Sequence, residues 1–234
     1  MRRRLFRSSR KWRRLILPHI GNDIVDLTSQ PNGQKSTDSR FLRKILTDTE
    51  IEQVRSSGDP DAALWSFWAC KEAAYKVIQK QTSGAAFVPR RWSVCFQASV
   101  NSPVGLQTLK EDYRDGAVFV PGFDAVYVRL FPFFSYLHCI AVDAFCVMDN
   151  IIAHVDRMPD QETSGGADPS LFARVRLVRS LAAALQLPEE DMRIIRETKD
   201  GGLMPPRLYI AGVPSGIEIS ISHDGDYIAY AYIV

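Results

Sequence analysis

Two acidic residues stand in an otherwise apolar stretch near the start of the chain. Residues 20–27 read I-G-N-D-I-V-D-L, which is typical of a short β-strand carrying Asp23 and Asp26. A buried carboxylate is costly unless it is paired or binds a cation. Because residues three apart in a strand point to opposite faces, Asp23 and Asp26 are not expected to share one ion. Gly21 lies on the face of Asp23, where its missing side chain permits close approach of another group.

A second group of chemically useful residues follows in a segment with strong helix propensity. Residues 68–76 read W-A-C-K-E-A-A-Y-K, and Glu72 and Lys76 share one helix face because they are four residues apart. On an exposed helix this would be an ordinary surface ion pair. Trp65 and Trp68 argue against full exposure, however. A carboxylate and an ammonium at the edge of a buried face suit Mg2+ and phosphate, respectively.

A third group lies near the end of the chain, where residues 220–225 read S-I-S-H-D-G. Serine and histidine side chains at the end of a strand can donate hydrogen bonds to phosphate oxygens. The alternative is a turn capped by Asp224, with the histidine at the surface. A hydrolase triad does not fit, because adjacent residues of one strand end cannot adopt its geometry and no G-x-S-x-G motif is present.

The elements that position these groups alternate in type along the chain. Hydrophobic periodicity and capping residues predict long helices at 61–79 and 171–187, a helix at 37–46 capped by Thr37 or Asp38, and a further helix start at Thr47. β-branched and aromatic runs predict strands at 92–97, 117–120, 124–131, 136–148, 192–197, 207–210, 217–222 and 226–234.

Helix is followed by strands in each half, which indicates an α+β fold with two units. These units could pack as a pseudo-symmetric pair with a cleft between them. We expect a basic, disordered arm at 1–19, a first subdomain at 20–157, a linker at 158–170 and a second subdomain at 171–234.

Charge is distributed unevenly in a chain of ordinary globular composition, 46% hydrophobic and 24% charged. Residues 1–14 hold eight of the 29 basic residues and no acidic one, which leaves 21 basic against 27 acidic residues elsewhere. This arm could contact nucleic acid, anionic lipid or an acidic protein, or it could be a disordered tail or a start codon assigned too early. No apolar run approaches membrane-spanning length, so we expect a soluble, cytoplasmic protein.

Taken together, the three motifs resemble those of the 4′-phosphopantetheinyl transferase superfamily. Its signatures are G-x-D-x-x-E or G-x-D-x-E, then W-x-x-K-E-A-x-x-K, then S-x-S-H, and each has a counterpart here within about residues 20–80 and 170–234. The resemblance implies two α+β subdomains, each a small antiparallel sheet packed with helices. The motif order is that of the short, trimeric acyl-carrier-protein synthases, but this chain is about twice their length. It therefore resembles two such units fused, which favours a monomer.

The resemblance also implies roles for individual residues. Asp23 and Glu72 would hold Mg2+ on the pyrophosphate of coenzyme A, and Lys76 would contact its phosphates. Ser222 and His223 would contact the nucleotide end at its 3′-phosphate, and Arg179 would be a further phosphate contact. Asp26 replaces the Glu of the short enzymes, and we do not expect it to bind the metal directly.

The reaction that the resemblance implies is transfer of 4′-phosphopantetheine from coenzyme A to a serine of an apo acyl or peptidyl carrier protein, with release of adenosine 3′,5′-bisphosphate. Mg2+ would neutralise charge on the phosphate oxygens, and Lys76 would add to this as a second catalytic group beside Glu72. Glu72 could accept the serine proton directly or through a water molecule, and the sequence leaves both routes open.

The partner implied by this reaction is a carrier protein with an acidic helix. The helix at 37–46 places Arg40, Arg43 and Lys44 on the face opposite its apolar stripe, where they could bind such a helix or form an ordinary solvated face. Two other functions compete with the transferase. One is a catalytically inactive module that binds coenzyme A, and the other is a nucleic-acid-binding protein that uses the basic arm, although no nucleic-acid-binding motif accompanies it.

Overall fold

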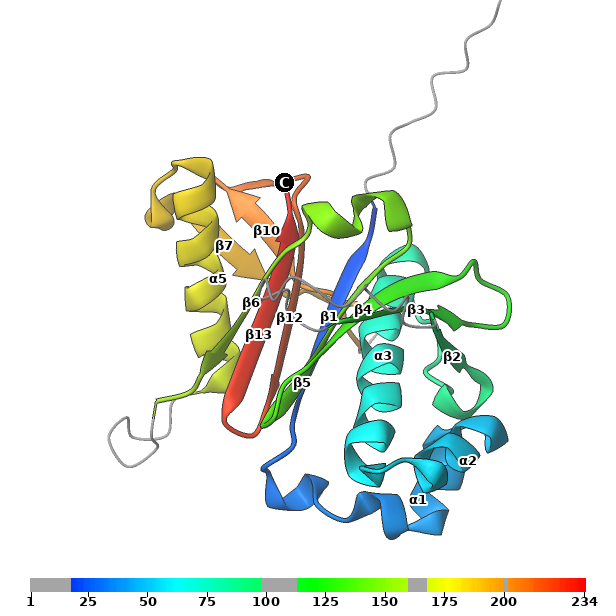
Figure 1. Ribbon diagram of the computed structural model, residues 1–234. Helices are drawn as coiled ribbons and strands as arrows, with labels where there is room; N and C mark the ends of the chain where they lie inside the picture. The colour runs from blue at the N-terminus through cyan, green and yellow to red at the C-terminus, as the bar shows by residue number, and fades with distance from the viewer. Residues whose placement is uncertain (1–17, 98–112, 160–167, 200–201) are drawn as a thin grey trace, which may run out of the picture.

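Antiparallel sheets packed with helices make up the two halves of the molecule, so the predicted α+β class is confirmed (Figure 1). The computed structural model describes residues 18–97, 113–159, 168–199 and 202–234. The basic stretch at 1–14 lies outside these ranges. Of the helices within them, none combines the length and apolar character needed to cross a membrane.

The first half is built on a five-stranded antiparallel sheet. Its order is β1 (Ile20–Asp26), β5 (Tyr136–Val142), β4 (Val126–Pro132), β3 (Arg114–Phe119) and β2 (Ser93–Phe96). β1 is buried along its whole length and pairs with β5, with Asp23 opposite Cys139. Apolar and β-branched residues therefore form the strand that carries the first acidic motif.

Three helices follow β1 in the chain, and each begins at a side-chain cap. They are α1 (Ser39–Ile45), α2 (Asp48–Ser56) and α3 (Pro60–Gln81). Asp38 caps α1, and Thr47 caps α2 in a reciprocal pair with Glu50, as the sequence predicts. α3 starts one residue earlier than predicted, because Asp59 accepts a hydrogen bond from the Ala62 N–H and Pro60 fits the first helical turn.

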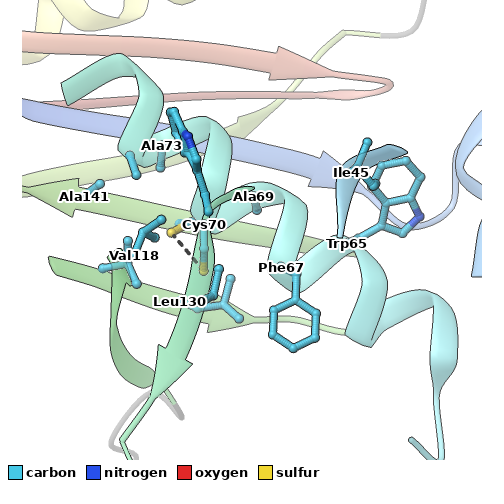
Figure 2. Packing of buried hydrophobic residues seen from close by; sticks show 14 of the residues in the cluster. Ile45, Trp65, Phe67, Ala69, Cys70, Ala73, Val118, Leu130 and Ala141 are labelled. Atoms are coloured by element: carbon cyan, nitrogen blue, oxygen red, sulfur yellow. Dashed lines mark hydrogen bonds between the residues drawn. The ribbon is translucent and has the colours of Figure 1, made fainter. Parts of the chain in front are cut away.

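Close packing of α3 against the sheet forms the main core (Figure 2). Small residues on α3, including Ala69, Cys70 and Ala73, face buried side chains of β3, β4 and β5 such as Val118, Leu130 and Ala141. Gly21 on β1 lies under the same helix, and a Cβ atom there would be 2.0 Å from the Ala73 carbonyl oxygen. The predicted role of Gly21 in close approach is thus confirmed, and the approaching group is the α3 backbone.

The second half carries one long helix, α5 (Pro169–Leu185), against a three-stranded antiparallel sheet (Figure 1). The order of this sheet is β12 (Glu218–Asp224), β13 (Tyr227–Ile233) and β6 (Ile152–Arg157). Two smaller sheets complete this half: β11 (Val213–Pro214), β10 (Arg207–Ile210) and β7 (Met192–Ile195), and then β8 (Thr198–Lys199) with β9 (Gly202–Leu203).

The predicted strand at 136–148 is shorter than expected, and the sequence did not predict β6 or the two-residue strands β8, β9 and β11. The predicted strand at 136–148 ends at Val142, and Phe145–Asn150 form a 3₁₀ helix instead. β6 follows this helix and pairs with β13, although it precedes the predicted subdomain boundary at residue 158. Its sequence, I-A-H-V-D-R, alternates weakly and lies mostly half-exposed, so it lacks a strong strand signal.

The two halves meet where β1 lies beside β12 (Figure 1). These strands belong to different sheets, and in the described part of the chain the hydrogen bonds between them run through side chains. The Asn22 N–H donates to Ser220 Oγ (2.9 Å), and the Asp26 N–H donates to Asp224 Oδ2 (2.9 Å). We call this contact between β1 and β12 the seam.

Candidate functional site

The centre of the candidate site is an ion pair between β1 and α3. Lys76 Nζ lies 3.0 Å from Asp23 Oδ1 and also donates to the Asn22 carbonyl oxygen at 2.6 Å. An ammonium group carries three protons. The described residues accept two of them, so one remains for a further acceptor such as a phosphate oxygen.

Glu72 lies one helical turn before Lys76, in the same electrostatic environment as Asp23. Burial, reinforced by the negative charge of Asp23, raises the pKa of Glu72 to about 7, while Lys76 acts in the opposite direction. Burial also raises the pKa of Asp23 above its usual value, although the Lys76 charge and hydrogen bond oppose the shift. The structure therefore brings the three predicted residues Asp23, Glu72 and Lys76 together.

This pair of carboxylates fits a magnesium ion chemically. Burial destabilises both ionised groups, the charge of Asp23 adds to the cost for Glu72, and a divalent cation would relieve these costs. Mg2+ is commonly bound through one or two carboxylates while it keeps several waters. Among the described residues, no cluster of three or more histidine, cysteine or acidic side chains forms a complete metal site. Asp23 and Glu72 thus match the two-carboxylate arrangement rather than an all-protein cage.

A cavity of about 140 Å³ opens beside this centre, between α3 and the second half of the molecule. Its walls combine α3, the start of α5, β12 and the segment around Pro205. The cationic or potentially cationic residues that line it are Lys76, Lys80, Arg174, Arg196 and His223. Such a lining favours an anionic ligand with several phosphate groups.

Lys80 lines the cavity, but its protons are already used within the protein. Its Nζ donates to the carbonyl oxygens of Ile20 (2.8 Å) and Ile219 (2.7 Å) and to Glu218 Oε2 (2.8 Å). These three contacts tie α3 to both strands of the seam. Lys80 therefore contributes charge and rigidity to the cavity, whereas Lys76 keeps one proton that no described residue accepts.

Two residues of the S-x-S-H motif have different surroundings: Ser222 lies in the seam and His223 faces the cavity. His223 is exposed and lines the cavity. Ser222 is buried and accepts a hydrogen bond from Asn22 Nδ2 at 3.0 Å, and it is not among the described residues that line the cavity. The structure thus brings His223 to the predicted site, and it places the Ser222 hydroxyl on Asn22.

Arg179 lies apart from the cavity that Arg174 lines. The Arg179 guanidinium is exposed and lies 3.6 Å from Glu189. Because successive helix residues rotate by about 100°, two residues five apart on α5 point in clearly different directions. Arg174 and Ser170 are four apart, and both line the cavity. The structure therefore offers Arg174, rather than Arg179, as the α5 cation facing a ligand.

Asp26 has a structural environment, distinct from that of Asp23. Its carboxylate accepts hydrogen bonds from the Thr28 N–H and hydroxyl and from the Asp226 N–H. Burial would raise the pKa of Asp26, but these hydrogen bonds outweigh it and lower the pKa below its usual value. The ionised carboxylate is thus satisfied by the protein, in keeping with the expectation that it is not a direct metal ligand.

The predicted docking helix α1 presents its charges to solvent. Arg40, Arg43 and Lys44 are exposed, while Leu42 and Ile45 are buried against the core. The apolar and basic faces of α1 are therefore arranged as the sequence predicts. Whether a carrier protein binds the basic face stays a prediction.

Sequence reasoning missed Asn22, Lys80, Arg174 and Arg196 as residues of this region. Lys80 carried a usable signal, because it follows Lys76 by one helical turn. Asn22 offered no such signal, because it occupies the x position of the G-x-D motif, where any residue is allowed. Arg174 and Arg196 reach the cavity only through the packing of the second half onto the first.

Comparisons with known proteins agree with the motifs. A sequence model of the 4′-phosphopantetheinyl transferase superfamily matches residues 19–117, so the resemblance stated above is confirmed for this part of the chain. A holo-[acyl-carrier-protein] synthase of Leptospira biflexa is 33% identical over 67 residues, which are 29% of this chain and 53% of that protein. One from Chlorobaculum tepidum is 37% identical over 59 residues, 25% of this chain and 50% of the relative.

A fatty acid synthase subunit and a solved structure complete the comparison. The fatty acid synthase alpha subunit hexA of Dothistroma septosporum is 30% identical over 96 residues, 41% of this chain and 28% of that protein. The crystal structure of the Thermotoga maritima holo-[acyl-carrier-protein] synthase is similar over 84% of each chain at 14% identity, with a TM-score of 0.35 that supports no argument from fold. The matched region spans about half the length of the curated synthases.

Proposed function

From the superfamily match at residues 19–117, we propose that this chain transfers 4′-phosphopantetheine from coenzyme A to a serine of an apo carrier protein. The observation that carries the proposal is the meeting of Asp23, Glu72 and Lys76 beside a cavity lined with cationic side chains. The products are the holo carrier protein and adenosine 3′,5′-bisphosphate. The relatives named as holo-[acyl-carrier-protein] synthases support an acyl carrier protein as the acceptor.

Asp23 and Glu72 are the residues that would hold Mg2+ in this proposal. Their buried carboxylates provide oxygen ligands, and the bound ion would neutralise negative charge on the pyrophosphate. Lys76 directs its remaining proton to a phosphate oxygen and stabilises charge that develops there. Its two contacts to β1 hold the ammonium in place, so little reorganisation is needed when the substrate binds.

The chemical step forms a bond between the serine oxygen and phosphorus and breaks the bond to the adenosine bisphosphate oxygen. The serine proton must leave as the new bond forms. We propose that Glu72 accepts this proton, directly or through a water molecule. Burial raises the pKa of Glu72 to about 7 in the protein without Mg2+, and a bound cation would favour the ionised form that accepts a proton.

The second half of the molecule would bind the nucleotide end. We propose that His223, Arg174 and Arg196 contact the 3′-phosphate and neighbouring phosphates, because they line the cavity on the side opposite α3. Arg196 is already oriented by a hydrogen bond from its Nε to the Met204 carbonyl oxygen at 2.9 Å. The sequence also predicts a phosphate contact for Arg179. In this proposal such a contact requires the Arg179 guanidinium to move away from Glu189.

Product analysis tests the proposed reaction. The protein is incubated with coenzyme A, Mg2+ and an apo acyl carrier protein, and nucleotides are separated by chromatography. The proposal predicts one adenosine 3′,5′-bisphosphate for each carrier molecule modified. Binding of coenzyme A without any release of this nucleotide would instead support an inactive binding module of the same fold.

A further inference from the structure

Asn22 is bonded to both walls of the cavity at once. Its carbonyl oxygen accepts from Lys76 Nζ at 2.6 Å, on the α3 wall. Its N–H donates to Ser220 Oγ at 2.9 Å and its Nδ2 donates to Ser222 Oγ at 3.0 Å, both on β12. His223, which lines the cavity, is the next residue on that strand.

The seam gives these side-chain bonds unusual importance. β1 and β12 are members of different sheets, so no backbone ladder of either sheet sets their separation in the described part of the chain. The distance between Lys76 and His223 therefore depends on side chains that cross the seam. Asn22 is fully buried, and two of its hydrogen bonds cross the seam while a third holds Lys76 of α3.

The chemistry of Asn22 is not explained by packing alone. Its Oδ1 is the one buried side-chain polar atom without a hydrogen-bond partner among the described residues. An unpaired buried acceptor costs stability, and an apolar side chain of similar size would avoid that cost. The amide is therefore better explained by the Ser222 hydroxyl that its Nδ2 holds in place.

We propose that Asn22 is a positioning residue that fixes the separation of the two cavity walls, and that Ser222 acts through Asn22 rather than by touching the nucleotide. This inference rests on the proposed function, since it assumes that coenzyme A occupies the cavity. It changes the role of Ser222 from a ligand contact to one half of a seam bond.

A double-mutant cycle tests the inference with Asn22→Leu, Ser222→Ala and the double variant. Coenzyme A affinity is measured by calorimetry, and unfolding by urea reports stability. Each single substitution removes the hydrogen bond between Asn22 Nδ2 and Ser222 Oγ, and each is expected to weaken coenzyme A binding roughly tenfold. Because both variants break the same bond, the double variant should also lose about tenfold, whereas independent contacts would lose about a hundredfold.

Two further measurements separate positioning from simple destabilisation. Ser180→Ala, which removes the Ser180–Tyr232 hydrogen bond away from the seam, should lower stability without changing coenzyme A affinity. At saturating coenzyme A, kcat of the Asn22→Leu variant should stay within about twofold of wild type, so that the loss appears in KM. If Asn22→Leu does not fold, Asn22→Ser replaces it in the same cycle.

The outcomes distinguish this inference from the proposed function. The positioning role would be overturned if the affinity losses of the two single variants multiplied in the double variant, or if an Asn22 variant bound coenzyme A as tightly as wild type. Either result would leave the transferase proposal intact. Failure of the wild-type protein to bind coenzyme A would overturn both.

Discussion

The acidic residues of the site are costly to the apoprotein. Asp23 and Glu72 both have a raised pKa, with burial as the largest cause. The charge of Asp23 raises the pKa of Glu72 further, while Lys76 acts in the opposite direction on both. Groups held in an unfavourable state usually mark a functional site. The arrangement is understandable if a cation binds between them during function.

Magnesium should therefore stabilise the folded protein through these two residues. At a hundredfold excess of Mg2+ over its Kd, binding contributes about 2.7 kcal/mol, or a rise in Tm of roughly 5–10 °C. Asp23→Asn and Glu72→Gln should abolish this rise, and the exposed control Glu52→Gln should keep it. Thermal unfolding followed by circular dichroism checks the result, and an undiminished rise in either site variant would refute the metal assignment.

How far these residues could be predicted follows from their chemistry. Asp23, Glu72 and Lys76 stand out because charged groups in apolar segments require an explanation. Arg174 and Asn22 do not stand out, because a helix arginine and a strand asparagine have many ordinary roles. Their importance depends on contacts between residues about 200 positions apart, such as the Asn22–Ser222 bond, which no local pattern records.

At the scale of elements, α3 can position Glu72 and Lys76 only because it lies very close to β1. A Cβ atom at residue 21 would lie 2.0 Å from the Ala73 carbonyl oxygen. Gly21→Ala must therefore push α3 away from the strand. We expect a loss of about 3 kcal/mol in the free energy of unfolding, together with loss of transfer.

Gly58→Ala provides a matched control for this prediction. No heavy atom of the described residues would lie within 4 Å of a Cβ at residue 58, so the effect of Gly58→Ala on stability should stay within about 0.5 kcal/mol. Urea unfolding of the two variants measures the difference. A Gly21→Ala protein as stable and active as the Gly58→Ala protein would contradict the close packing of α3.

Most elements could be predicted because their signals are local. The caps at Asp38 and Thr47 and the long apolar pattern of α3 are read within a few residues. β6 could not be predicted in this way, because its pairing with β13 is provided by a strand about 75 residues away. Which strands join one sheet, and where the two sheets meet, likewise depends on packing of the whole chain.

At the scale of the whole molecule, a partly buried ionic cluster connects the two halves. Glu218 on β12 accepts from Lys80 of α3 and contacts His19 before β1. Burial would raise the pKa of Glu218, but the His19 hydrogen bond and the charge and hydrogen bond of Lys80 lower it to about 2. Its ionised form is therefore strongly stabilised by folding.

The stability that Glu218 supplies should depend on pH in a defined window. A lowered carboxyl pKa stabilises the folded state above the unfolded pKa of 4.5, and this contribution disappears as pH falls through about 2. Glu218→Gln should cost about 3 kcal/mol at pH 7 and progressively less toward pH 2. Urea unfolding across this range measures it, and a difference that does not vary with pH would contradict the role of the charge.

The exposed basic face of α1 is the surface that we predict binds the carrier protein. Arg40→Glu with Arg43→Glu should raise KM for the carrier protein, because an acidic helix would then meet negative charge, and leave coenzyme A affinity unchanged. The effect should shrink with added salt, since exposed charges are screened over about 10 Å at roughly 0.1 M. Arg193→Glu, an exposed change in the other half, is the control. An unchanged KM at low salt would place the carrier elsewhere.

The most direct test of the central claim is intact-mass spectrometry of an apo acyl carrier protein after incubation with this protein, coenzyme A and Mg2+. The account predicts that the carrier gains one phosphopantetheine group with the wild-type protein. Asp23→Asn and Glu72→Gln should slow this modification roughly a thousandfold, because the metal contribution of several kcal/mol is lost. An unmodified carrier with the wild-type protein, or full modification by both variants, would contradict the account.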